Sequence, residues 1–159
     1  REKAAFMADP NMQPELYGYD YILERQLKPE ARQDIVAKLK ELEIKPTAMI
    51  DVSDGLASEI LHLCKDSKVG CRIFEDRIPM HQKAIDTAKE FDIVPCVAAL
   101  NGGEDYELLF TVKQEDYEKV KDMEDVRIIG FMTAEENVAE LITTDEHIIP
   151  IEAQGFKHF

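Results

Sequence analysis

Two carboxylates flank a hydroxyl in the segment Ile50-Asp51-Val52-Ser53-Asp54-Gly55-Leu56. The apolar patterns on either side place this motif where a strand ends and a helix begins. Unpaired N–H groups and partial positive charge at a helix N-terminus suit phosphate, and carboxylate oxygens are ligands that Mg²⁺ takes. The motif therefore predicts a site for metal and phosphate. It also fits a plain helix start, in which Ser53 or Asp54 is the N-cap and Asp54-Gly55 is a turn.

A second acidic motif, Asn101-Gly102-Gly103-Glu104-Asp105-Tyr106-Glu107-Leu108, places two glycines before adjacent carboxylates. Because glycine has no Cβ, such a loop is sterically open and can meet a ligand at backbone distance. The same residues are typical of a hairpin turn with solvated charges. Both interpretations are open on the pattern alone.

The printed sequence closes with an aromatic segment, Gly155-Phe156-Lys157-His158-Phe159. An aromatic ring near a site can stack on a heterocycle or a cation, although a terminal phenylalanine more often packs on the core.

The remaining histidines are isolated, and the cysteines lack the spacing of metal ligands. We therefore assign no chemistry to these two sets, which are His62, His81, His147, Cys64, Cys71 and Cys96.

The charge balance excludes two classes of partner. Asp and Glu outnumber Lys and Arg by 33 to 19 in 159 residues, which leaves a formal net charge of −14. Nucleic acids and anionic membranes are bound through basic residues, so neither is expected as a partner. The longest uncharged apolar stretch, residues 93–100, contains a proline and is too short to span a bilayer. No signal peptide is visible, and three scattered cysteines are typical of a reducing compartment, so we expect a cytoplasmic protein.

The elements that must position these motifs follow from the spacing of apolar residues. Pro29 suits the first position of a helix, which Pro46 would stop. A buried strand is expected over 47–52 and a helix from Leu56, then strands over 70–74, 106–112, 126–133 and 138–144, helices over 80–91 and 114–123, and an undecided element over 94–100. Strands and helices mix without the strict alternation of a doubly wound sheet. This pattern predicts an α+β fold in which helices cover a mixed sheet.

Four stretches, taken in order, resemble the C-terminal half of thiamine-monophosphate kinase. They are Met49–Leu56, Asn101–Phe110, Ile128–Thr133 and Gly155–Phe159, and Leu27-Lys28-Pro29-Glu30-Ala31-Arg32 is similar as well. The second acidic motif is fairly specific, and the ordered set covers nearly the whole chain. The wider superfamily includes aminoimidazole ribonucleotide synthetase and selenophosphate synthetase, which share the fold but differ in the acidic loops.

The resemblance implies a fold, a reaction and roles for five residues. The fold would be a three-layer α/β/α arrangement, partly like a ferredoxin-type plait. The reaction would move the γ-phosphoryl group of ATP onto the phosphate of thiamine monophosphate, with Mg²⁺, to make thiamine diphosphate. Asp51 and Asp54 would ligate Mg²⁺, Ser53 would contact the ATP phosphates, Glu104 would hold the thiamine substrate, and Phe156 would lie near its ring system.

The same resemblance predicts how the chain is organised. Residues 1–28 would be a helical arm continuing from an N-terminal half of the same polypeptide, and residues 29–159 would form the C-terminal domain. The other half would carry most of the nucleotide site, further metal-binding aspartates and the dimer interface. We therefore expect a homodimer of the full-length protein and no activity from the present chain by itself.

Two other functions fit the sequence. One is another ATP-using enzyme of the same superfamily, although the second acidic motif and the aromatic tail favour the thiamine branch. The other is a non-catalytic domain that serves binding or assembly. Stabilisation of the intact protein by Mg-ATP and thiamine phosphates distinguishes this last class, because a ligand at 100 times its Kd adds about 2.7 kcal/mol of stability.

Overall fold

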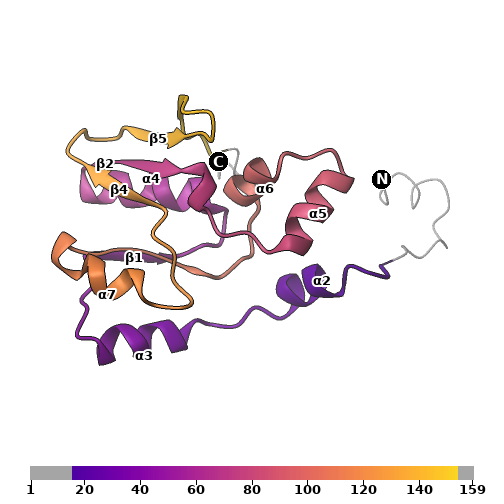
Figure 1. Ribbon diagram of the computed structural model, residues 1–159, viewed down its shortest axis with the longest axis horizontal. Coiled ribbons are helices and arrows are strands. Elements are labelled where there is room, and N and C mark those ends of the chain that lie inside the picture. Colours follow the sequence, from indigo (N-terminus) through magenta and orange to yellow (C-terminus); the bar gives the residue numbers. More distant parts are fainter. Residues whose placement is uncertain (1–15, 154–159) are drawn as a thin grey trace.

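The computed structural model describes residues 16–153, and Figure 1 shows their arrangement. The helices are α2 (Asp20–Leu27), α3 (Gln33–Glu41), α4 (Leu56–Ser67), α5 (Gln82–Glu90), α6 (Pro95–Asn101) and α7 (Tyr117–Lys121), with short 3₁₀ turns η1 (Glu75–Arg77) and η2 (Gln114–Asp116). The strands are β1 (Ala48–Asp51), β2 (Gly70–Phe74), β3 (Leu108–Thr111), β4 (Gly130–Thr133), β5 (Ala139–Ile142) and β6 (Ile148–Pro150).

The strands form two sheets. Strands β1 and β3 pair antiparallel, from Ala48 opposite Thr111 to Asp51 opposite Leu108. The second sheet has the order β4-β2-β5-β6, in which β2 and β5 are parallel and the other pairs are antiparallel. The predicted mixed sheet is therefore present.

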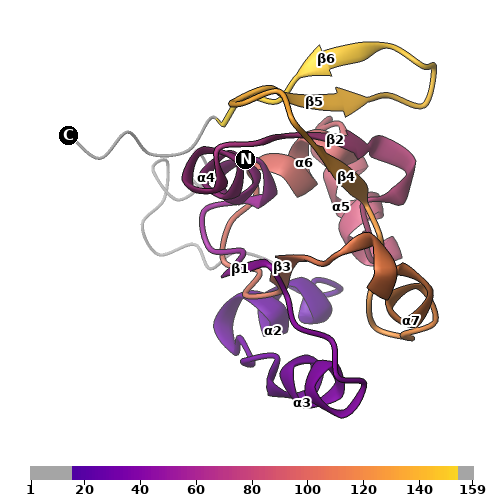
Figure 2. The same cartoon turned by 90° about the vertical axis from the view of Figure 1, so that its left-hand side faces the viewer.

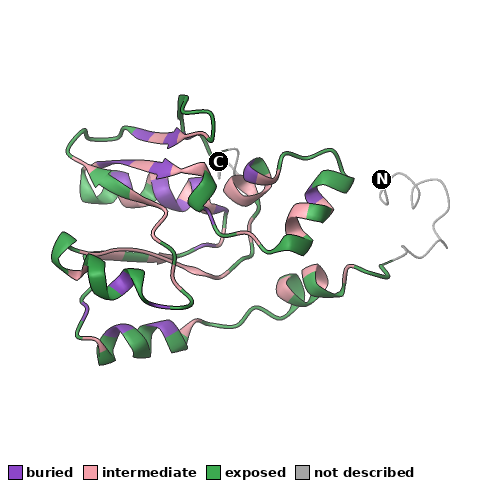
Figure 3. Ribbon diagram, in the orientation of Figure 1, coloured by how far each residue is buried: buried purple, intermediate pink, exposed green. Residues whose placement is uncertain are grey.

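Helices cover the strands from two sides. Helix α4 contacts strands of both sheets, and its buried face, with Ile60 and Cys64, packs against Ile73 and Leu141. Figure 2 shows α3 on the side of β1 and β3 opposite α4. A second apolar cluster fills that side and includes Ile35, Leu39, Ile44, Val120 and Met123. In Figure 3, buried residues lie on α3 and α4 as well as on strands of the larger sheet. Helices packed on a mixed sheet confirm the predicted α+β fold.

Several boundaries differ from the prediction. The helix expected from Pro29 begins at Gln33, because Arg32 has ψ of 55° and its side chain is engaged elsewhere. Strand β1 is not fully buried, since Met49 and Asp51 are exposed. The polar helix over 114–123 is divided into η2 and α7.

Other differences concern elements that the apolar spacing left undecided or missed. The undecided stretch over 94–100 is helix α6, with Pro95 at its start, where a missing N–H costs no hydrogen bond. Strand β6 was not predicted, because it has only three residues, all exposed.

The extent of the N-terminal arm stays a prediction. Residues 1–15 lie outside the described part of the chain, as does the predicted stacking residue Phe156. Across residues 16–153, each helix is too short or too polar to cross a membrane.

Candidate functional site

The two acidic motifs lie against each other because the β1–β3 pairing continues through them. The Val52 amide donates to the Glu107 carbonyl at 2.8 Å, and the Tyr106 amide donates to the Val52 carbonyl at 2.8 Å. One residue further on, the Glu104 amide donates to the Ser53 carbonyl at 2.7 Å. Residues predicted from separate parts of the sequence are thus joined by backbone hydrogen bonds.

Glycines allow this close approach. Gly55 has φ of 108°, and a Cβ there would lie 2.9 Å from the Leu100 carbonyl oxygen. A Cβ on Gly103 would lie 2.5 Å from the Ser53 carbonyl oxygen. The open space that the glycines provide is therefore filled by the partner loop of the same chain.

The start of α4 is held by a residue that the sequence analysis missed. Gly55 is the N-cap and no side chain caps the helix there, so the alternative in which Ser53 or Asp54 is the N-cap is wrong. Instead, the buried Glu59 carboxylate accepts from the Asp54 amide at 3.1 Å and from the Ser53 hydroxyl at 3.4 Å. An acidic residue in the first turn also complements the helix dipole. The sequence feature that could have identified this role is the position of Glu59 on the apolar face of α4.

The carboxylates of the first motif are open to a ligand. Asp51 and Asp54 are exposed, and neither carboxylate has a hydrogen bond or ion pair to another residue within 16–153. Their oxygens are hard donors of the class that Mg²⁺ takes. Within residues 16–153, however, no three His, Cys, Asp or Glu side chains converge to hold a metal ion. The first motif therefore fits part of a metal coordination set.

The pKa of the Tyr106 hydroxyl depends on the charges of both motifs. This hydroxyl donates to the Glu104 carboxylate at 2.7 Å, and this hydrogen bond is the main reason why the pKa of Tyr106 is raised. The negative charges of Glu104, Asp51 and Asp54 raise the pKa further. The charges of three predicted site residues, Asp51, Asp54 and Glu104, thus act on the same phenol.

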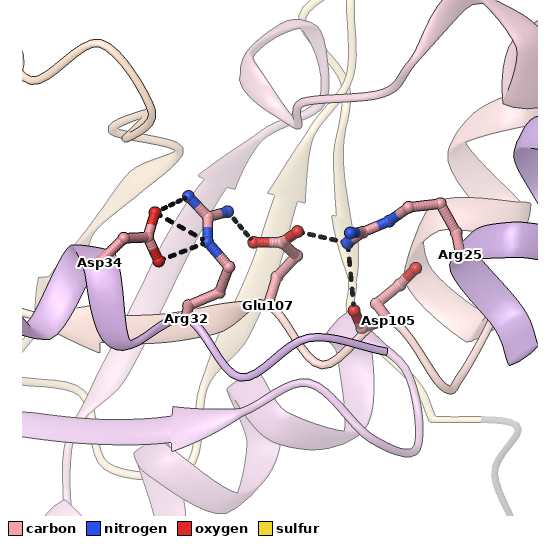
Figure 4. A network of polar contacts seen from close by, with 5 residues as sticks. All are labelled: Arg25, Arg32, Asp34, Asp105 and Glu107. Atoms are coloured by element: carbon pink, nitrogen blue, oxygen red, sulfur yellow. Dashed lines mark hydrogen bonds and ion pairs between the residues drawn. The ribbon is translucent and has the colours of Figure 1, made fainter. Parts of the chain in front are cut away.

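A chain of ion pairs includes Glu107 of the second motif, as Figure 4 shows. Arg25 and Arg32 each contact a different oxygen of the Glu107 carboxylate at 2.5 Å. Arg32 also contacts Asp34 at 2.9 Å, and the hydrogen bond to Asp34 is the main cause of the raised pKa of the Arg32 guanidinium. We call Arg25, Glu107, Arg32 and Asp34 the arginine bridge. Spacing along the sequence gave no signal for it, since its members are up to 82 positions apart.

Asp105, in the second motif, lies beside Arg25 of the bridge. Although the residue keeps contact with solvent, the protein around it displaces enough water to raise the pKa of its carboxyl. The positive charge of Arg25 opposes this shift, and the negative charge of Glu107 adds to it. The Asp105 carbonyl also accepts a long hydrogen bond of 3.4 Å from Arg25.

The predicted site residues of the two motifs differ in what surrounds them, although Val52 and Leu56 of the first motif line the same hollow as the second motif. Gly103, Glu104 and Arg25 line a broad hollow that extends between the two sheets, whereas Asp51 and Asp54 lie outside its lining. Among the other residues considered from the sequence, the three cysteines are buried free thiols, as expected. Burial raises the pKa of Cys71 to about 12 and of Cys96 to about 11, which keeps both thiols protonated and unreactive.

The contact at Gly55 generates a stability prediction. Gly55→Ala should lower the free energy of unfolding by more than Gly18→Ala, by at least about 1 kcal/mol. Both glycines have positive φ, but a Cβ on Gly18 meets nothing within 4 Å, whereas one on Gly55 meets backbone. Urea denaturation of both variants measures the difference. Equal losses would show that the two loops do not pack as described.

A second prediction concerns the Tyr106 phenol. Because the pKa is raised mainly by Glu104, Glu104→Gln should lower it toward the ordinary value near 10. NMR titration of ¹³C-labelled tyrosine rings, with Tyr106→Phe to assign the signal, measures this pKa. Glu115→Gln removes an exposed charge that has no part in the shift, and it serves as the control. An unchanged pKa in Glu104→Gln would contradict the hydrogen bond.

Comparisons with known proteins bear on the family and the fold of the chain. A family model described as "AIR synthase related protein, C-terminal domain" matches residues 12–142. The thiamine-monophosphate kinase of Buchnera aphidicola subsp. Schizaphis graminum is 34% identical over 145 residues, which are 88% of this chain and 43% of the relative. That of Bacillus subtilis is 32% identical over 161 residues, which are 96% of this chain and 47% of the relative.

A solved structure shares the fold. "AaThiL complexed with AMPPCP and TMP" superposes with a TM-score of 0.70 at 29% identity, over 99% of this chain and 46% of that one. The chain therefore spans less than half the length of these proteins. These findings confirm the resemblance to the C-terminal half of thiamine-monophosphate kinase, and the chain belongs to the family of the AIR synthase related protein C-terminal domain.

Proposed function

We propose that the protein containing this chain transfers the γ-phosphoryl group of ATP to the phosphate of thiamine monophosphate, which yields thiamine diphosphate. The observation that supports the proposal is the backbone pairing of the two acidic motifs, which joins the loop of Asp51 and Asp54 to the loop of Glu104. The relatives are named for this activity, and a structural neighbour was solved with AMPPCP, an ATP analogue, and TMP.

Charge explains why such a site carries aspartates. Both substrates are anions, and two unit charges 4 Å apart repel by about 4 kcal/mol at an effective dielectric of about 20. Carboxylates beside them add to this repulsion unless cations lie between. We therefore propose that Asp51 and Asp54 are ligands of Mg²⁺, which would neutralise the phosphates when it is bound.

The other residues would position the substrates. The Ser53 hydroxyl would exchange its long bond to Glu59 for an ATP phosphate oxygen. Glu104 would attract the cationic thiazolium ring of the thiamine substrate. Stacking by Phe156, which is not among the described residues, stays a prediction. No general base is needed, because the attacking phosphate oxygen is already ionised at neutral pH, so positioning and charge neutralisation supply the rate.

The rest of the site is proposed to come from the part of the polypeptide that the relatives have and this chain does not span. Asp51 and Asp54 would then supply only part of the metal ligands. We propose that it also forms a homodimer, that the enzyme works in the cytoplasm, and that this chain alone has no kinase activity. Turnover by this chain alone would reject the shared site.

The direct test of the activity uses the full-length protein. Incubation with Mg-ATP and thiamine monophosphate should yield thiamine diphosphate. Substrates of other enzymes in the superfamily, such as an aminoimidazole ribonucleotide precursor, should not react. Turnover of another substrate alone would favour the superfamily alternative. No turnover and no thermal stabilisation by any of these ligands would favour a non-catalytic domain.

The metal role of Asp51 generates a mutational prediction. Asp51→Asn in the full-length protein should lower kcat by about 10²-fold and raise the Mg²⁺ concentration needed for half-maximal activity, because a charged ligand is lost. Steady-state kinetics over a range of Mg²⁺ concentrations measure both effects. Asp66→Asn, on the exposed face of α4, is the matched control and should change neither. An unchanged Mg²⁺ requirement in Asp51→Asn would remove its assignment as a ligand.

A further inference from the structure

We propose that Arg25, Arg32 and Glu107 are positioning residues, which fix the second acidic motif in the shape that presents Glu104 to the substrate. This inference rests on the proposed function. It goes beyond that function by giving a specific task to the side chains of Arg25, Arg32 and Glu107, none of which is assigned a contact with substrate or metal.

The second motif needs external support because its backbone is strained. Glu104 has φ of 67° and Tyr106 has φ of 53°, so two non-glycine residues on either side of Asp105 are in the left-handed region. Such conformations persist only where the surrounding structure holds them. On one side, the amides of Glu104 and Tyr106 are held by the carbonyls of residues 52 and 53.

The arginine bridge holds the other side. Both carboxylate oxygens of Glu107 are occupied, each by a different arginine, while its backbone carbonyl accepts from the Val52 amide. Arg25 also donates to the Asp105 carbonyl. Glu107 is therefore the residue at which the first motif, the second motif and the arm meet.

The arginines are themselves fixed in place. Arg32 is held by Asp34 at the start of α3. Helix α2, which carries Arg25, is attached to α5, because the Tyr19 hydroxyl donates to Glu90 at 2.6 Å and the Tyr21 ring stacks on His81 at 3.9 Å. A guanidinium that is already ordered loses little freedom when it binds a carboxylate, so the bridge can hold a strained loop.

The chain offers a matched control. Arg72 and Glu140 form an ion pair at 2.8 Å, and their side chains are 37% and 24% exposed. The corresponding values for Arg25 and Glu107 are 39% and 42%. The control pair joins β2 to β5 in the other sheet, and it has no contact with either acidic motif.

The experiment measures the KM for thiamine monophosphate and the KM for ATP in the full-length protein. The variants are Arg25→Gln, Arg32→Gln, Glu107→Gln and the control Arg72→Gln. Loosening the second motif should raise the KM for thiamine monophosphate by about tenfold in the three bridge variants. The KM for ATP should stay within about twofold of the original value, because the first motif keeps its own support from Glu59. Arg32→Lys should recover only part of the loss, since lysine cannot make the forked contact with two carboxylates.

A readout that does not depend on activity separates failure of this inference from failure of the proposed function. In Glu107→Gln, the Tyr106 hydroxyl should lose its fixed contact with Glu104, and the pKa of Tyr106 should fall toward its ordinary value. In Arg72→Gln it should not change. If the original protein makes no thiamine diphosphate, the proposed function fails, and this NMR titration alone decides whether the bridge shapes the loop.

Two results would overturn the positioning role. One is that the bridge variants behave like Arg72→Gln, as expected of an ordinary surface ion pair. In that case both KM values rise equally, or only the thermal stability falls. The other is an unchanged pKa of Tyr106 in Glu107→Gln. Arg25→Gln is the mildest variant, because the residue lies near the end of an exposed helix, and it keeps the test valid should Glu107→Gln fold poorly.

Discussion

The hydrogen bonds between Val52 and the second motif are the constraint on which the site depends. Strands β1 and β3 pair over only four residues each, so their ladder would normally end at Asp51 and Leu108. It continues instead through residues with no regular strand geometry, since Val52 bonds to both Tyr106 and Glu107. This continuation joins the two acidic loops at the ends of the strands, because the backbone bonds fix the loops and leave the Asp51 and Asp54 carboxylates open to a ligand.

The two acidic loops are held against the mutual repulsion of their carboxylates in two different ways, one by hydrogen bonds and the other by ion pairs. Glu59 holds the first loop through a backbone amide and a hydroxyl, from a buried position at the start of α4. The second loop is held by charge, through the arginine bridge. Exposed ion pairs contribute little individually, typically about 0–1 kcal/mol. Because the arginine bridge uses both oxygens of the Glu107 carboxylate, it also fixes the orientation of that side chain. For the shape of the loop, this fixed orientation matters more than the free energy that the ion pairs contribute.

Some of this arrangement could be read from the sequence and some could not. Strand β2 matches its predicted range, and α4 begins at the predicted Leu56, because apolar periodicity and glycine punctuation are local signals. The predicted start of α3 at Pro29 was wrong. Pro29 satisfies the local rule for a first helical residue, but the Arg32 side chain contacts Glu107, which is 75 positions away in the sequence. Glu59 and Glu107 were missed for the same reason. A single charged residue has no periodicity, so its role depends on which distant group the fold places beside it.

Under the proposed function, dividing the metal ligands between two parts of the polypeptide has a physical consequence for folding. A full cage of aspartates in one unit would repel itself strongly in the absence of metal, and in a chain of net charge −14 that cost would oppose folding. Sharing the ligands between this chain and another part of the polypeptide lowers the cost in each. Asp51 and Asp54 can then remain exposed and solvated until the other ligands, the cations and the phosphates arrive together. Under the proposed function, assembly of the two parts and binding of Mg-ATP are coupled, because each supplies the charge partner that the other lacks.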